Sequence, residues 1–191
     1  MQATATMGTR SLADRLRWND LVMPWLVRLA FLGVGVLVGL YVLAPRQVRA
    51  SDTYLPPAYA AIPNAVFAID TGDGLVTLPA KIADTVALRN VGFKDVGAKA
   101  IENELLLFQL TRATTARVTY TMEGLRAPVQ AAAIAESGEV VAIHDVAVGT
   151  DRLAVPESHR WLLLARSGTF DALGIGVGST LDPESVRKVN Y

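Results

Sequence analysis

Two histidines carry the side chains best suited to acid–base chemistry. His144 precedes Asp145, and His159 follows Ser158. A serine nucleophile needs its base within hydrogen-bond reach, but neighbouring side chains on an extended segment point to opposite faces. We therefore expect that Ser158 and His159 do not pair directly. His144 ends a predicted strand and is interpreted as a surface or structural histidine, so no catalytic residue is assigned.

Metal and nucleotide ligands are poorly represented. Two histidines and no cysteine fall short of the three protein ligands that catalytic zinc usually has. Asp70–Gly74 begins like a calcium loop, but Leu78 and Lys81 stand where its later ligands belong, so a turn is predicted. The glycines of 174–180 do not follow the dinucleotide-binding pattern and predict a turn and a closing strand. No metal and no cofactor are expected.

Charge argues against nucleic acid as a partner. Eighteen Lys and Arg balance eighteen Asp and Glu, whereas nucleic-acid binders usually carry a clustered basic surplus. Arg112, Arg117 and Arg126 lie close in sequence and could form a local basic face, suited to solvent or to an anionic protein partner. The positions of Arg160 and Arg166 relative to this face stay open.

An apolar segment predicts a transmembrane helix over residues 24–45. Residues 29–44 carry no charge, and Arg28 alone interrupts the run back to Pro24. About 21 residues span roughly 30 Å as a helix, one hydrocarbon core. A cleaved signal peptide ending at Ala50 and a buried soluble helix are the alternatives. Gly35 and Gly39 form a GxxxG pattern that could pack against another helix.

Arginine counts predict the orientation of this helix. Four arginines precede or enter the span and two follow it closely, which favours a cytoplasmic N-terminus. The arm of residues 1–23 is then cytoplasmic, either as a short amphipathic helix at the interface or as a tail. The C-terminal domain is predicted to lie in the periplasm, anchored in the inner membrane of a bacterium.

Beyond the span, the pattern predicts a small, mainly β domain. Three prolines make residues 46–64 an extended linker, whose Tyr54, Leu55, Tyr59 and Ile62 could rest on the domain or on a neighbouring protein. The domain covers 65–182, and 183–191 is a tail. Turn residues predict hairpins 65–69/75–78 and 131–134/140–143. The remaining predicted elements are a helix over 82–90 ended by Gly92, strands over 105–108, 116–120 and 161–165, and a helical turn over 170–173.

The order of short motifs over residues 76–181 resembles the DUF192 family. The motifs are Ala83-Asp84-Thr85 followed by Gly92-Phe93, Leu106-Leu107-Phe108, Tyr120-Thr121-Met122 with Pro128, Gly138 to His144, Trp161-Leu162-Leu163 with Gly168, and Gly174-Ile175 with Gly178. The resemblance implies a single domain with mainly β (α+β), partly barrel-like structure and one or two short helices. Family members are often exported or lipid-anchored, and their activity is largely undefined.

The polar residues of the family signature are mostly replaced in this chain. Thr121, Gly124, Leu125 and Gln130 stand at its Trp, Asn, Thr and Asp positions, and Ser179 replaces the Asp of the last turn. A remnant of the family site would centre on four residues: Met122, Arg126, Pro128 and His144.

Two functions follow from these observations. The first is a non-enzymatic, single-pass accessory or scaffolding subunit that packs on the outer face of a larger membrane protein complex, with respiratory and photosynthetic assemblies as candidate hosts. Its partners would be other membrane subunits, reached through the helix and linker, and the lipid bilayer. The alternative is a membrane-tethered periplasmic small-molecule-binding module, or a DUF192-type enzyme, that uses the remnant site.

Overall fold

The first hairpin forms around the predicted turn. The computed structural model describes residues 51–114 and 117–189, in which β1 (Asn64–Asp70) pairs antiparallel with β2 (Leu75–Ala83). In the turn, the backbone N–H of Gly72 donates to Asp70 Oδ1 at 3.0 Å and the N–H of Thr71 donates to the carbonyl of Gly74 at 3.1 Å. The interpretation of Asp70–Gly74 as a turn is confirmed.

The main sheet has the order β10-β1-β2-β3-β8-β5-β6, with β9 also pairing with β1. Pairing is antiparallel throughout except between β2 and β3. The remaining strands of this sheet are β3 (Leu106–Gln109), β5 (Val129–Ile134), β6 (Val140–Val146), β8 (Trp161–Arg166), β9 (Thr180–Leu181) and β10 (Arg187–Val189). A separate two-stranded sheet joins β4 (Val118–Thr121) to β7 (Arg152–Val155).

Strand β9 partly closes the main sheet on itself. Ile69 of β1 pairs with Leu181 of β9, and the N–H of Leu181 donates to the carbonyl of Gly138 at 2.8 Å. Glu139, just before β6, also forms a bridge with Thr180. The two ends of the sheet therefore meet through β9, and the expectation of a mainly β, partly barrel-like domain is confirmed.

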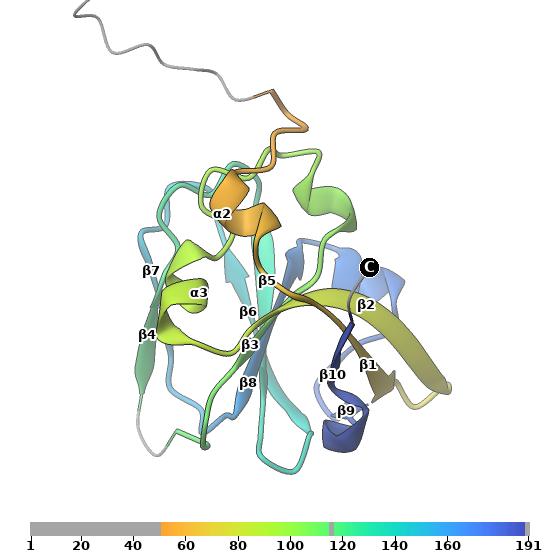
Figure 1. Ribbon diagram of the computed structural model, residues 1–191. Coiled ribbons are helices and arrows are strands. Elements are labelled where there is room, and N and C mark those ends of the chain that lie inside the picture. The colour runs from red at the N-terminus through yellow and green to blue at the C-terminus, as the bar shows by residue number, and fades with distance from the viewer. Residues whose placement is uncertain (1–50, 115–116, 190–191) are drawn as a thin grey trace, which may run out of the picture. The chain divides into compact units, whose positions relative to one another are not determined.

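Alternation along the central strands creates two apolar cores. On β3 and β8, Leu107 and Leu163 face one cluster, whereas Phe108 and Leu162 face the other, as expected for a strand buried on both faces. The second cluster also contains residues of α2 (Pro57–Ala60), η1 (Ile101–Asn103), β4 and β7. Figure 1 shows α2, α3 (Val86–Val91), β4 and β7 on one side and β1, β9 and β10 on the other.

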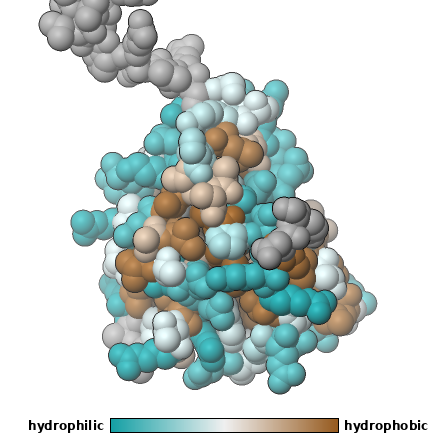
Figure 2. All heavy atoms as spheres, in the orientation of Figure 1, coloured by the Kyte–Doolittle hydropathy of each residue, from teal (hydrophilic) through white to brown (hydrophobic). Residues whose placement is uncertain are grey.

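Six large apolar residues are exposed among the described residues. Figure 2 shows hydrophilic side chains crossing between the apolar ones on the face in view. The exposed large apolar residues are Tyr54, Leu55, Leu75, Val86, Val148 and Val177.

The helix predicted over 82–90 is shorter than expected. Ile82 and Ala83 belong to β2 and pair with Leu107 and Phe108 of β3, so tertiary pairing overrides their helical spacing. The helix begins after Thr85, whose hydroxyl accepts from the N–H of Leu88 at 3.2 Å. Gly92 ends it as predicted, with a φ of 48°. The helical turn predicted over 170–173 is confirmed as α4 (Thr169–Ala172).

The predicted linker and tail both contribute to the folded domain. Within the described part of the linker, Tyr59 and Ile62 are buried, and the Tyr59 hydroxyl donates to Glu104 at 2.9 Å. Tyr59 lies in α2 and Ile62 just after it, and both pack in the core, so these two residues rest on the domain. The one turn of helix at Pro57–Ala60 differs from the extended tether predicted from the prolines. In the tail, η2 (Pro183–Ser185) leads into β10, which pairs with β1.

The N-terminal predictions lie outside the described residues. These are the arm of residues 1–23, the transmembrane helix over 24–45 and the packing face of Gly35 and Gly39. Within residues 51–114 and 117–189, no helix has the length and apolar character needed to cross a bilayer.

Candidate functional site

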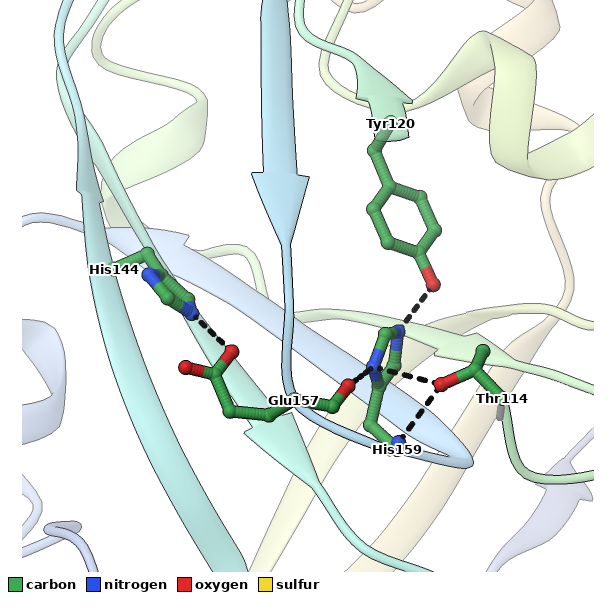
Figure 3. Close-up of polar contacts among 5 residues, drawn as sticks. All are labelled: Thr114, Tyr120, His144, Glu157 and His159. Carbon is green, nitrogen blue, oxygen red and sulfur yellow. Dashed lines mark hydrogen bonds and ion pairs between the residues drawn. The ribbon is translucent and has the colours of Figure 1, made fainter. Parts of the chain in front are cut away.

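His159 has no exposed surface and is the one fully buried ionisable side chain besides Tyr59 among the described residues. Its Nδ1 lies 2.7 Å from the carbonyl of Glu157 and its Nε2 lies 2.5 Å from the Tyr120 hydroxyl. A carbonyl can only accept, so Nδ1 carries a proton; in the tautomer with its one proton on Nδ1, Nε2 accepts from the Tyr120 hydroxyl. Figure 3 shows Tyr120 reaching down from β4 toward this ring.

Tyr120 is held in its protonated form by burial. Desolvation raises its pKa to about 12, against an opposing effect of the Arg89 charge. The hydroxyl therefore stays a hydrogen-bond donor over the physiological pH range. Because Tyr120 and His159 are both buried, their hydrogen bond joins β4 to the segment before β8 and does not face a substrate.

Thr114 fastens the loop after β3 to the same segment. Its N–H donates to the carbonyl of His159 at 2.9 Å, and its hydroxyl accepts from the N–H of His159 at 3.0 Å. The Ser158 hydroxyl donates to the carbonyl of Thr114 at 2.5 Å. The Ser158 hydroxyl is thus bonded to backbone rather than to the His159 ring, as expected for neighbouring side chains that point to opposite faces.

Glu157 connects the two histidines of the chain. Its carbonyl accepts from His159, and its carboxylate lies 3.0 Å from Nε2 of His144. The His144 and Glu157 side chains are 23% and 32% exposed, so His144 occupies a half-buried, hydrogen-bonded position on β6 (Figure 3). Sequence reasoning missed Glu157 and Tyr120. The alternation of β4 marked Tyr120 as inward-facing, but no local signal distinguishes Glu157 in its loop.

An open groove shares Thr114 with this network. It has a volume of about 560 Å³ and is lined by Leu110, Thr111, Arg112, Ala113, Thr114, Arg117 and Val118. A smaller polar hollow of about 260 Å³ adjoins it through Leu110 and Thr111 and is also lined by Asp84, Gln109 and Arg160. Thr114 therefore belongs to both the groove wall and the hydrogen-bond network around His159.

The structure brings together two of the three arginines expected to form a basic face. Arg112 and Arg117 line the groove, and neither makes an ion pair with another described residue. Arg126 instead pairs with Asp95 at 3.2 Å, and Arg160 lines the adjoining hollow.

The four residues of the predicted remnant site do not share a network. Met122 is 5% exposed and packs in the apolar core, while Arg126 is paired with Asp95. The carbonyl of Pro128 accepts from the N–H of Ser167 at 3.1 Å, and His144 binds Glu157. Within the described residues, no hydrogen bond or ion pair links His144 to the other three.

Groups of metal ligands are absent from the part of the chain that the structure describes: no three His, Asp or Glu side chains lie close enough to hold an ion. The space beside Met122, which Phe93 and Phe108 also line, measures about 10 Å³. That volume suits one water molecule at most, so the groove beside Arg112 and Arg117 is the larger candidate for a ligand.

Solved structures of two bacterial proteins share this fold. A Sinorhizobium meliloti protein, named as a proposed transcription regulator, matches with a TM-score of 0.55 and 21% identity over 62% of this chain and 92% of its own. A Novosphingobium aromaticivorans protein of unknown function matches with a TM-score of 0.52 and 19% identity over 68% and 98%. At such identities the likeness concerns the fold alone. No curated protein matches the chain.

The family resemblance rests on more than half of the chain. The model of the DUF192 family, described as "Uncharacterized ACR", matches residues 67–183 of 191. This range contains the motifs recognised over 76–181 and all strands from β2 to β9. The chain belongs to the DUF192 family.

Proposed function

We propose that this chain is a non-enzymatic, single-pass accessory subunit whose domain packs on the outer, periplasmic face of a larger membrane protein complex. The observation that carries the proposal is the attachment of residues 51–55 to the domain. The N–H of Gly97 donates to the carbonyl of Tyr54 at 2.8 Å, and the N–H groups of Lys99 and Ala100 donate to the carbonyl of Asp52 at 2.8 and 3.1 Å.

This attachment leaves little chain between the domain and the predicted helix. Residues 46–50 alone separate the predicted span from the attached segment, and five extended residues reach at most about 18 Å. A domain on so short a connection stays near the bilayer, where it can contact the exposed parts of membrane subunits.

The attached segment offers apolar side chains for such a contact. Tyr54 and Leu55 are 40% and 43% exposed, although the backbone at Asp52 and Tyr54 is bonded to the domain. A rigid backbone lowers the entropy lost on association. We assign Tyr54 and Leu55 to the surface that meets the partner subunits.

The polar residues best suited to chemistry support binding rather than catalysis. His159 and Tyr120 are buried and bonded to each other, and the Ser158 hydroxyl is bonded to backbone. These groups hold the loops around the groove in place. Their role in this proposal is to shape the domain.

Partner co-purification tests the proposal. The full chain, extracted in mild detergent from its native membrane, is expected to migrate with other membrane subunits, and Tyr54→Ala with Leu55→Ala should reduce their recovery at least fivefold. Val177→Ala is the matched control, because Val177 is also exposed and apolar, at 68%. Isolation of the monomer alone, or equal recovery with all variants, would contradict the accessory role. Respiratory and photosynthetic complexes are the first hosts to examine.

The alternative of a membrane-tethered small-molecule-binding module is favoured by a different observation, the groove beside Arg112 and Arg117. That groove, rather than the packed surroundings of Met122, is where such a ligand would bind.

A further inference from the structure

We propose that the groove lined by residues 110–114, 117 and 118 binds a small organic anion, whose carboxylate or phosphate oxygens are held by Arg112 and Arg117. The groove has a volume of about 560 Å³, and known small-molecule pockets span roughly 300–1,000 Å³. The inference is independent of the accessory role, because ligand binding and partner recovery are separate measurements.

The charges of the groove determine the sign of the ligand. Arg112 and Arg117 are exposed, line the same space and make no ion pair with any residue that the structure describes. Two guanidinium groups can each donate two parallel hydrogen bonds to a carboxylate or phosphate. Among the described residues that line the groove none is acidic, so an oxyanion would be attracted to it.

The other groove residues indicate an organic body rather than a bare inorganic ion. Leu110, Ala113 and Val118 supply apolar surface, and the hydroxyl-bearing Thr111 and Thr114 stand among them. Burial of a ring or short alkyl chain against this surface would add to the attraction of the arginines. An anion with an apolar portion uses both features.

A neighbouring hydrogen-bond donor has no acceptor within the described structure. Arg160 lines the polar hollow that adjoins the groove, and its Nη1 pairs with Glu136 at 3.2 Å. Its Nε is nevertheless buried without a hydrogen-bond partner, and burying such a donor is costly. The Arg160 guanidinium therefore adds a third positive charge beside the groove, in a hollow that the Asp84 carboxylate also lines.

The groove wall is held in place before any ligand arrives. Hydrogen bonds between Thr114 and the Ser158–His159 segment, and one from the N–H of Leu110 to the Arg160 carbonyl at 2.9 Å, fasten the two ends of residues 110–114 to the segment that leads into β8. The Tyr120–His159 bond fastens the same segment to β4, next to Val118. A preformed wall reduces the ordering cost of binding.

Calorimetry on the full chain in a non-ionic detergent tests the inference. Benzoate or phenyl phosphate is expected to bind saturably, with neutral benzamide and inorganic phosphate each at least tenfold weaker. Arg112→Gln and Arg117→Gln should each weaken binding at least fivefold. Arg152→Gln is the matched control. Arg152 is also an exposed arginine, but it lies at the end of β7 that pairs with Thr121, whereas the groove residue Val118 pairs with Val155 at the other end.

Three results would overturn the inference. These are no saturable binding of either aromatic anion, equal binding of benzamide and benzoate, and equal affinities for Arg112→Gln, Arg117→Gln and Arg152→Gln. Binding of a glutamate-rich peptide without binding of the small anions would also overturn it and would identify the groove as a protein contact. Thermal melting is measured for all three variants. If their melting temperatures equal that of the wild type, a change in affinity comes from the groove and not from unfolding.

Discussion

At the scale of single residues, the hydrogen bond between Tyr120 and His159 has the clearest consequence for stability. Tyr120→Phe leaves Nε2 of the buried His159 without its donor, so we expect the free energy of unfolding to fall by about 1–3 kcal/mol in urea denaturation. Tyr54→Phe is the control, because it removes a hydroxyl oxygen from an exposed tyrosine. It should change the free energy of unfolding by less than about 0.5 kcal/mol.

The same tyrosine predicts a dependence on alkaline pH. Because burial raises the Tyr120 pKa from 10.0 to about 12, the folded state favours the protonated phenol. That stabilisation is complete below pH 10 and is lost as the pH rises toward 12. The stability difference between the wild type and Tyr120→Phe should therefore narrow between pH 10 and 12. A difference that stays constant over this window would show that Tyr120 is not buried as described.

At the scale of structural elements, Gly97 determines whether residues 51–55 can lie on the domain. A Cβ at position 97 would stand 2.2 Å from the Asp52 carbonyl oxygen and 2.7 Å from that of Ser51. Both are backbone atoms, so Gly97→Ala should displace the segment. In the wild type, the Lys99 and Ala100 amides both donate to the Asp52 carbonyl. Because the variant would lose these hydrogen bonds, we expect both amides to exchange with deuterium at least tenfold faster.

Gly176→Ala is the control for this substitution. A Cβ at Gly176 meets no atom within 4 Å, and neither Gly97 nor Gly176 has a positive φ, so the two differ in the space around them. Equal amide protection in the Gly97→Ala variant and the wild type would show that the attachment does not depend on this close approach. It would also remove the main support for a domain held near the membrane.

At the scale of the whole molecule, the predicted topology can be tested directly. A cytoplasmic N-terminus and periplasmic domain predict that alkaline phosphatase fused after Tyr191 is active and that green fluorescent protein at the same place is dark. The reverse pattern would contradict the orientation predicted from the arginines on either side of residues 24–45. Release of a mature chain lacking residues 1–50 would instead favour the signal-peptide alternative.

The elements that the sequence predicted well are those governed by local chemistry. Glycine-containing turns and alternating or wholly apolar runs located both hairpins, the buried strand at Trp161 and the helix end at Gly92. The motif order identified the family. Predictions were least accurate at Ile82 and Ala83, at the helix containing Tyr59 and at β10, because partners distant in sequence determine those structures.

The sequence by itself determined the β-rich class of the domain, its family and the absence of a direct Ser158–His159 pair, since turn chemistry, periodicity and spacing are local properties. Only the tertiary structure decided that Glu157 contacts both histidines, that Tyr120 donates to His159 and that Arg112 and Arg117 line one groove. Those contacts depend on how β3, β4, β6 and β8 bring their adjoining loops together. The pairing of strands far apart in the chain is a cooperative outcome of burying two cores.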